Sequence, residues 1–256
     1  MKNKCWVVKI GSALLTNNGK GIDKDLISEW VEQIVELKSY DIDVVLVSSG
    51  SIVEGMKRLG WKDKPSDIHK LQAAAAVGQM GLVQAYEYLF AEYKVQTAQV
   101  LLTQDNLTNT KHFENISATL ENLLEFGAVP VINENDTVAT EEIKFGDNDT
   151  LAALVANLLG AERLIILTDQ HGVFDDDPRI NKNASLIKEI NFDDEKLERV
   201  AGKTGGILGS GGMHSKVMAA KQAAKSKTFS NIAWGREDKV LTRIHQGEHI
   251  GTLVHC

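Results

Sequence analysis

Two lysines near opposite ends of the chain stand where a side chain could hold a phosphoryl group. Lys9 ends an apolar run and precedes a Gly-Ser pair, and glycine lets a backbone approach a phosphate closely. Lys216 ends the glycine-rich stretch 204–216, and a helical pattern follows at once. Backbone N–H groups of such a loop can surround phosphate oxygens. The glycine-rich stretch favours phosphate binding over a flexible linker, whereas the segment at Lys9 suits a phosphate contact and a solvent-facing lysine at a sheet edge equally.

The glycine-rich stretch matches neither common nucleotide fingerprint. Ser215 rather than glycine precedes Lys216, and Val217 follows it, so the Walker pattern is absent. The glycines do not directly follow the first strand, as the dinucleotide-binding pattern requires. His214 within the stretch is a conceivable general base, although an exposed loop histidine is the better interpretation.

Polar clusters in the middle of the chain could bind small charged groups. The string 48–51, Ser-Ser-Gly-Ser, leads into a helical pattern whose first N–H groups favour an anion, although a serine N-cap with a structural glycine is by itself the better explanation. Residues 133–136 and 145–149 are dense in carboxylates and amides. Such groups can hold an ammonium group, magnesium or a lysine, whereas the structural alternative is a turn-rich hairpin.

Alternating strands and helices must position these clusters. Continuous apolar strands separated by helices predict an α/β fold with a mostly parallel sheet covered on both faces. Ligands of such sheets collect beyond the carboxyl ends of the strands, where the polar clusters fall. Gly78 and Gly81 argue against one unbroken helix over 66–93. Strands are expected at 5–10, 44–47, 97–102, 129–132, 164–167, 229–233 and 252–254, and helices after Asp23 and at 51–59, 66–93, 113–126, 148–159 and 213–225.

Composition narrows the class of protein. The 256 residues are 43% hydrophobic and 25% charged, which is ordinary for a globular chain, and no repeat or linker marks a domain boundary. A net charge of −7 argues against broad nucleic-acid binding. Cys5 and Cys256 give no disulfide framework or zinc spacing. No signal peptide or membrane-length apolar run is present, so we expect one cytoplasmic domain with no membrane partner.

Taken together, seven ordered strings resemble the amino-acid kinase family, and most closely its members that phosphorylate glutamate. They cover nearly the whole chain. The resemblance implies a three-layer αβα sandwich with about eight strands, the N-terminal half binding L-glutamate and the C-terminal half ATP. It further implies ATP- and Mg²⁺-dependent formation of L-glutamyl 5-phosphate in proline biosynthesis. The strings are Val8–Ser12, Val47–Ser51, Ala75–Gln79, Val131–Asp136, Phe145–Asp149, Leu167–Asp169 and Gly211–Lys216.

The same resemblance assigns residues to roles. Lys9 and Lys216 flank the transferred phosphoryl group, Asp149 orients both lysines, and no side chain is assigned to a metal. Glutamate contacts are implied for Ser49, Asn133, Asp136 and Asn148. Nucleotide contacts are implied for Lys9, Thr168, Asp169, Ser210, Gly211, Gly212, Met213, His214, Ser215 and Lys216.

Further expectations concern the whole protein. Many glutamate-phosphorylating members carry a C-terminal PUA domain, whereas this sequence stops at Cys256, so none is expected. The resemblance implies a homo-oligomer, for which the helical region 66–93 could supply an interface, and feedback inhibition by proline. The alternatives are a sister kinase acting on N-acetylglutamate, aspartate, carbamate or UMP, and a non-catalytic sensor. Asp136 with residues 147–149 favours a free ammonium over an acetylated amine.

Overall fold

A computed structural model describes residues 4–16, 21–139, 148–203 and 212–256. Its described residues form an eight-stranded sheet, ordered β3-β4-β2-β1-β5-β7-β8-β6, which confirms the predicted α/β class and strand number. Neighbouring strands are parallel except β7 and β8, which pair antiparallel. The strands are β1 (Lys4–Ile10), β2 (Ile42–Ser48), β3 (Thr97–Leu102), β4 (Val129–Glu134), β5 (Arg163–Thr168), β6 (Glu189–Asn191), β7 (Phe229–Trp234) and β8 (Thr252–His255).

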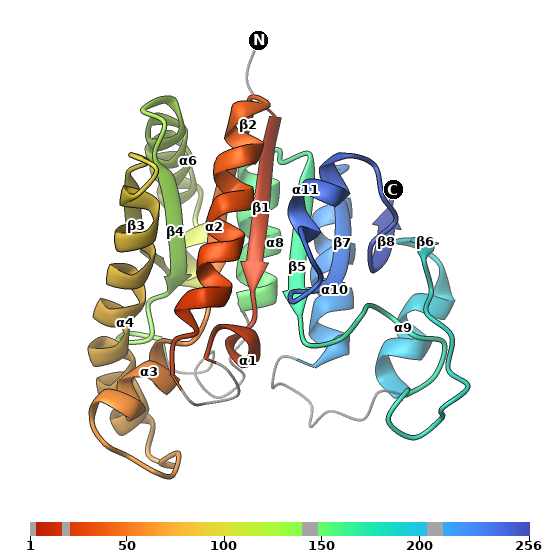
Figure 1. The fold of residues 1–256 in the computed structure, drawn as a ribbon, viewed down its shortest axis with the longest axis horizontal. Helices are drawn as coiled ribbons and strands as arrows, with labels where there is room; N and C mark the ends of the chain where they lie inside the picture. The colour runs from red at the N-terminus through yellow and green to blue at the C-terminus, as the bar shows by residue number, and fades with distance from the viewer. Residues whose placement is uncertain (1–3, 17–20, 140–147, 204–211) are drawn as a thin grey trace.

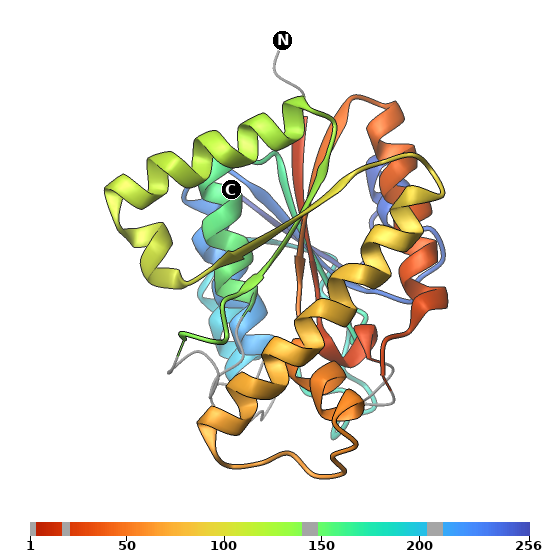
Figure 2. The same cartoon turned by 90° about the vertical axis from the view of Figure 1, so that its left-hand side faces the viewer.

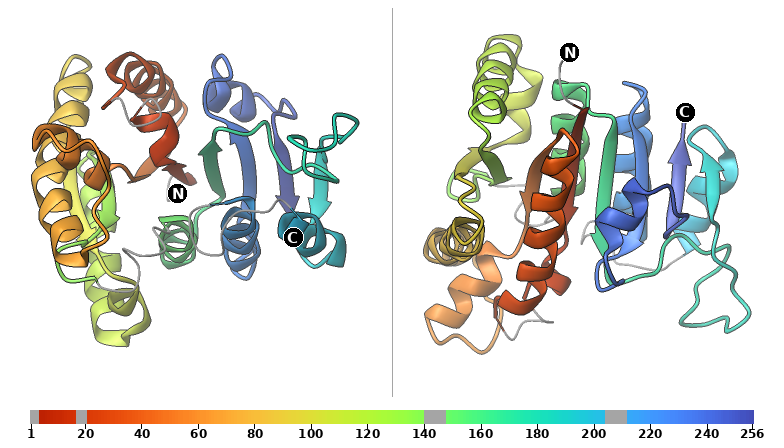
Figure 3. Two further views of the ribbon diagram at one scale, coloured as in Figure 1. Left: turned by 90° about the horizontal axis from the view of Figure 1, so that it is seen from below. Right: turned by 45° about the horizontal axis from the view of Figure 1, so that its top comes forward.

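Helices cover both faces of this sheet (Figure 1, Figure 3). One face packs against α2, α4 and α11, and the other against α6, α8, α9 and α10, so one hydrophobic core lies on each side of the sheet. The helices are α1 (Ser12–Leu15), α2 (Lys24–Ser39), α3 (Ser51–Arg58), α4 (Ile68–Ala91), α5 (Gln104–Thr108), α6 (Thr110–Glu125), α8 (Asn148–Leu159), α9 (Glu195–Lys203), α10 (Met213–Ala224) and α11 (Val240–His245).

The central strand β1 divides its side chains between the two cores. Trp6 and Val8 belong to the core under α2, whereas Val7 belongs to the core under α8 and α10. Side chains alternate along a strand, so Lys9 shares the face of Val7. A lysine at the carboxyl end of β1 is therefore directed to the layer that contains α8 and α10.

The helix expected over 66–93 is confirmed as α4, and it is continuous although Gly78 and Gly81 disfavour one unbroken helix (Figure 2). Its glycines serve close packing instead. A Cβ atom at Gly78 would lie 1.8 Å from the backbone oxygen of Ser51, and one at Gly55 of α3 would lie 1.7 Å from the oxygen of Ala74. The absence of side chains lets α3 lie directly against α4, beside the carboxyl end of β2.

Most predicted elements are confirmed with small shifts at their ends. Asp23 caps α2 as expected, its side chain accepting a hydrogen bond from the Leu26 N–H at 3.2 Å. The helix predicted at 113–126 begins earlier, since Asn109 accepts hydrogen bonds from the N–H groups of Lys111 and His112. The elements that the sequence did not predict are short or strongly charged: α1, α5, β6, α9 and α11.

The described residues include no helix long and apolar enough to cross a membrane. The carboxyl ends of β1, β4 and β5 point the same way in Figure 1, and α1 and α3 lie beyond that edge. This edge collects the polar segments that follow the strands, and it is where the candidate site forms.

Candidate functional site

Asp149 is shared by two lysines that come from opposite ends of the chain. Its Oδ1 forms an ion pair with Lys9 Nζ, and its Oδ2 lies 3.3 Å from Lys216 Nζ. All three side chains are buried, Asp149 completely. β1 supplies Lys9, the first turn of α8 supplies Asp149, and the first turn of α10 supplies Lys216. The fold therefore brings the three predicted catalytic residues together at one point.

Opposing effects act on the Asp149 carboxyl. Burial raises the pKa of Asp149. Attraction to the Lys9 and Lys216 ammonium groups, together with hydrogen bonds from Lys9 and Ser215, outweighs this effect and lowers the pKa to about 2. The N-terminal position on α8 also suits a negative charge. The carboxylate stays ionised at any physiological pH, so it fixes the two ammonium groups by charge rather than by exchanging protons.

A chain of buried amides lies on the β2 and β4 side of Asp149. The Asn148 amide nitrogen donates to Asn133 Oδ1 at 2.7 Å, to Ser49 Oγ at 2.9 Å and to the Ser48 carbonyl at 3.2 Å. Asn133 in turn donates to Gln79 Oε1 at 2.8 Å. Three of the four predicted glutamate-binding residues are thus in one network. Gln79 belongs to one of the resembling strings but was not predicted as a site residue, because no feature of the neighbouring sequence indicates that α4 reaches this site.

Asp136 lies at the edge of the same region, beside a cavity that Gln79 also lines. Ser51 Oγ donates to Asp136 Oδ2 at 2.9 Å, which connects the start of α3 to the segment after β4. Burial raises the pKa of Asp136, and the hydrogen bond from Ser51 offsets only part of this effect. A partly buried carboxylate at a cavity wall is suited to bind a cationic group such as an ammonium.

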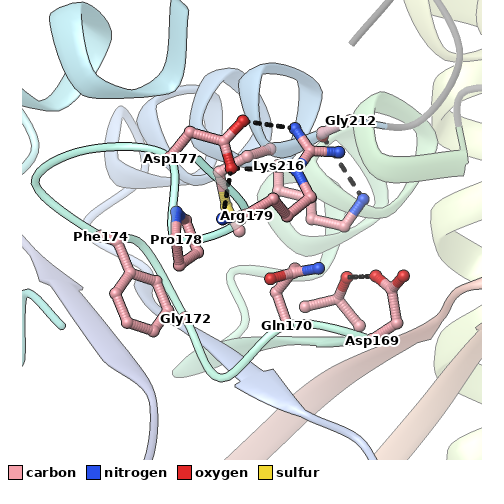
Figure 4. A pocket seen from close by; sticks show the side chains of 11 residues that line it. Asp169, Gln170, Gly172, Phe174, Asp177, Pro178, Arg179, Gly212 and Lys216 are labelled. Carbon is pink, nitrogen blue, oxygen red and sulfur yellow. Dashed lines mark hydrogen bonds and ion pairs between the residues drawn. The ribbon is translucent and has the colours of Figure 1, made fainter. Parts of the chain in front are cut away.

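A second cavity opens beside Lys216 (Figure 4). Lys216 and Gly212 line one wall, and Thr168 and Asp169 after β5 line another. The Thr168 hydroxyl donates to Asp169 Oδ1 at 3.1 Å. The cavity therefore unites two segments that were predicted separately to contact a nucleotide.

The loop after β5 adds residues that the sequence analysis missed. Arg179 is held against Asp177 by two hydrogen bonds, Nε to Oδ1 at 2.9 Å and Nη2 to Oδ2 at 2.8 Å. The only local signal was a proline between two opposite charges. The tertiary fold places this loop beside the Lys216 cavity, which its local sequence does not indicate. Its lining residues are Gln170, Gly172, Phe174, Asp177, Pro178 and Arg179.

The remaining predicted residues divide into three groups. Met213 lines the cavity beside Lys216, and His214 is exposed in the first turn of α10. Ser215 hydrogen bonds to Asp149 at 2.7 Å. Ser210 and Gly211, with residues 145–147, lie outside the described part of the chain.

The carboxylates near the Lys216 cavity determine whether the site could hold a magnesium ion. In the described segments, no three His, Cys, Asp or Glu side chains converge on one point. Mg²⁺ in kinase sites is usually held by one or two carboxylates together with substrate phosphates. Asp169, at the wall of the Lys216 cavity, is a carboxylate of that kind, so the site fits a magnesium ion that arrives with a nucleotide.

Solved structures with low sequence identity share the architecture. Carbamate kinase from Giardia lamblia, solved with AMP-PNP, superposes with a TM-score of 0.68 at 13% identity, covering 99% of this chain and 98% of its own. UMP kinase from Bacillus anthracis gives a TM-score of 0.67 at 15% identity, covering 100% and 97%. At these identities the likeness establishes the fold alone.

Sequence comparison identifies relatives of much higher identity. Glutamate 5-kinase from Hydrogenovibrio crunogenus is 58% identical over 253 residues, which cover 99% of this chain and 67% of that protein. Glutamate 5-kinase from Pseudomonas syringae pv. tomato is also 58% identical, over 97% of this chain and 67% of its own length. The profile of the amino acid kinase family matches residues 4–231. The chain therefore belongs to the amino acid kinase family.

Proposed function

We propose that the protein transfers the γ-phosphoryl group of ATP to the γ-carboxylate of L-glutamate. The products are L-glutamyl 5-phosphate and ADP, and the reaction is the first step of proline biosynthesis. The glutamate 5-kinases that are 58% identical over nearly the whole chain support this substrate. The geometry supports the same type of reaction.

One observation carries the proposal: a single buried carboxylate pairs with two lysines, next to an amide network and to a cavity. Asp149 directly follows Asn148 of the amide network, and its partner Lys216 lines the cavity that Asp169 also lines. Two ammonium groups that share one carboxylate can both turn toward an incoming anion. The arrangement is suited to a phosphoryl group passing between two bound substrates.

The chemistry needs charge neutralisation more than a base. The side-chain carboxyl of glutamate has a pKa of about 4.3, so the nucleophile is ionised at neutral pH. A carboxylate oxygen attacks the γ-phosphorus, the bond from that phosphorus to the β,γ-bridging oxygen breaks, and ADP leaves. Phosphoryl transfer of this kind is catalysed mainly by positioning and electrostatic stabilisation. Lys9 and Lys216 supply the positive charge, and Asp149 keeps both of them directed at the phosphoryl group.

The two cavities would divide the substrates between the halves of one domain. Asp136 would accept the glutamate ammonium group, while Ser49, Asn133 and Asn148 would complete the glutamate site. Mg²⁺ would be held by the ATP phosphates and Asp169 and would neutralise part of their charge. The nucleotide would contact Lys9, Thr168, Asp169 and the segment 210–216.

Hydroxylamine trapping of the acyl phosphate tests the proposal. Purified protein supplied with ATP, Mg²⁺ and glutamate is expected to form γ-glutamyl hydroxamate and an equal amount of ADP. Absence of hydroxamate with glutamate would reject the proposed reaction. ADP release that does not depend on glutamate would point to a nucleotide-binding sensor with a background ATPase activity.

A matched variant serves as the control for that assay. Removing one charge contact to a transition state typically costs ~2–4 kcal/mol, which is roughly a hundredfold or more in rate. Lys216→Ala is expected to lose at least that much kcat, while circular dichroism and gel filtration remain those of the folded protein. A variant that keeps wild-type kcat would contradict the two-lysine mechanism.

The sister kinases remain the alternative. N-acetylglutamate, aspartate, carbamate and UMP, assayed under the same conditions, are expected to give less than a tenth of the kcat/KM of glutamate. The partly buried Asp136 carboxylate favours glutamate over N-acetylglutamate, because an acetylated amine carries no positive charge to pair with it.

At the level of the whole protein, we propose a cytoplasmic homo-oligomer that proline inhibits. Exposed apolar side chains on α4, namely Val77, Met80 and Tyr88, would contribute to the subunit contact. Light scattering of the purified protein measures the assembly, and glutamate titrations with added proline measure the inhibition.

A further inference from the structure

Ser215 contacts the same oxygen of Asp149 as Lys216 does, and it lies closer. Its hydroxyl is 2.7 Å from Asp149 Oδ2, whereas Lys216 Nζ is 3.3 Å from that atom. The two residues are neighbours in the first turn of α10. One hydroxyl and one ammonium group therefore converge on a single carboxylate oxygen.

The hydroxyl has a choice of acceptor. Ser215 Oγ is also 2.9 Å from the carbonyl oxygen of Gly212, the N-cap of α10. A hydroxyl has only one proton, and hydrogen bonds to an ionised acceptor are shorter and stronger than those to a carbonyl. The shorter distance to Asp149 is consistent with the carboxylate as the principal acceptor.

The two contacts differ in how easily they can be given up. Lys216 reaches Asp149 through a long, flexible side chain, and the proposed reaction requires its ammonium group to serve the phosphoryl oxygens. Ser215 has one rotatable side-chain bond before its oxygen, so its hydroxyl stays where α10 places it. Asp149 Oδ2 then keeps a donor when Lys216 turns toward phosphate.

We infer that Ser215 is a positioning residue for phosphoryl transfer: its hydroxyl holds Asp149 in place while Lys216 exchanges the carboxylate for the phosphoryl group. Asp149 in turn keeps Lys9 directed at the site. For Ser215, this assignment replaces the nucleotide contact that the family resemblance implies and that is proposed above for the segment 210–216 as a whole. Because it concerns the same reaction, this role rests on the function proposed above.

A pair of variants with nearly equal shape isolates the hydroxyl. Ser215→Thr keeps it and Ser215→Val replaces it with a methyl group, while Ser215→Ala removes it without adding volume. A hydrogen bond to a charged group contributes enough free energy that its loss is expected to lower kcat roughly tenfold or more in the Val and Ala variants. The KM values for ATP and glutamate are expected to stay within about twofold, and the Thr variant is expected to recover most of the lost kcat.

Rates are expressed per folded site, counted by the stoichiometry of ATP-analogue binding, so that partial unfolding does not imitate a lower kcat. If the Val variant does not fold, the Ala and Thr variants give the same comparison, because alanine fits wherever serine does. A raised KM for ATP with unchanged kcat would make Ser215 a nucleotide ligand and overturn the inference. Equal kcat in wild type, Ala and Val, or an equal loss in Thr and Val, would overturn it as well.

The wild-type protein in the same assay separates the two levels. No glutamyl hydroxamate from the wild type rejects the proposed function itself. Hydroxamate formation by the wild type, with no selective kcat loss in the Ala and Val variants, rejects only the role of Ser215.

Discussion

Asp149 and Asp136 are both carboxylates in buried surroundings, and the protein shifts their pKa values in opposite directions. Asp149 is held by two ammonium groups, which outweigh its burial and bring its pKa to about 2. Asp136 accepts a hydrogen bond from the Ser51 hydroxyl instead, and burial raises the pKa of Asp136 above the ordinary value. One carboxylate therefore stays permanently charged, whereas the other becomes protonated first as the pH falls.

This contrast predicts a pH effect on substrate binding. Asp136 must be ionised to attract an ammonium group, and its raised pKa means that the ionised form is lost at a higher pH than for an ordinary aspartate. The KM for glutamate in the wild type is expected to rise on the acidic side, before that of ATP does. Steady-state kinetics across the acidic range measure both values.

Asp136→Asn is the matched variant for this prediction. Loss of a charged hydrogen bond costs ~1.5–3 kcal/mol, so the KM for glutamate is expected to rise roughly tenfold or more at neutral pH. Its additional acid-dependent rise should disappear, with little change in the KM for ATP. An acid-dependent rise that matches the wild type would show that another group controls glutamate binding.

At the scale of elements, the contact between α3 and α4 supports the glutamate side of the site. A Cβ atom at Gly78 would collide with the Ser51 carbonyl, and the Ser51 hydroxyl holds Asp136. Overpacking of this kind costs ~1–3 kcal/mol. Gly78→Ala is therefore expected to lower the free energy of unfolding by that amount and to raise the KM for glutamate. Urea unfolding and steady-state kinetics measure the two effects.

The same helix offers a control for Gly78→Ala. A Cβ atom at Gly81 would meet the guanidinium group of Arg58 at 2.2 Å, which is the far end of a flexible side chain. Arg58 can move aside, and alanine favours a helix by up to ~1 kcal/mol over glycine. Gly81→Ala is expected to leave stability nearly unchanged. Equal destabilisation by the two variants would mean that helix contact is not what Gly78 provides.

The elements that could be predicted from sequence are those whose own residues determine them. Buried strands such as β1 and β2 contain continuous apolar runs, and Asp23 marks the start of α2 by its capping geometry. The helix α4 could be predicted but its continuity was less evident, because the glycines that disfavour a helix are required by a neighbouring helix. Short elements such as β6 depend on the strand they join and carry little pattern of their own.

The same distinction applies to the site. Lys9 and Lys216 were identified from their local strings, but only the family resemblance, and then the fold, joined them through Asp149. Gln79 and Arg179 were missed as site residues because their position depends on how α4 and the loop after β5 fold back toward the sheet. Local sequence reports the type of chemistry, whereas tertiary packing determines the atoms that meet.

At the scale of the whole molecule, the two cavities predict separable binding of the two substrates. A ligand at a hundred times its Kd stabilises the folded state by ~2.7 kcal/mol, and each kcal/mol raises Tm by ~2–4 °C in a protein of this size. An ATP analogue is expected to raise the Tm of wild type and Asp136→Asn alike. Glutamate at the same concentration is expected to raise the Tm of Asp136→Asn by roughly half as much as that of the wild type, or less. Loss of both shifts in the variant would contradict two separate sites.

The ion pairs of Asp149 also have a consequence for how the protein is made. Lys9 belongs to β1, whereas Lys216 belongs to α10 and is synthesised much later. β1 pairs with β2, which follows soon, and with β5, which is synthesised much later. A nascent chain therefore has no complete reaction centre until Lys216 has been translated. Appearance of activity during synthesis would report that β1 and α10 have come together.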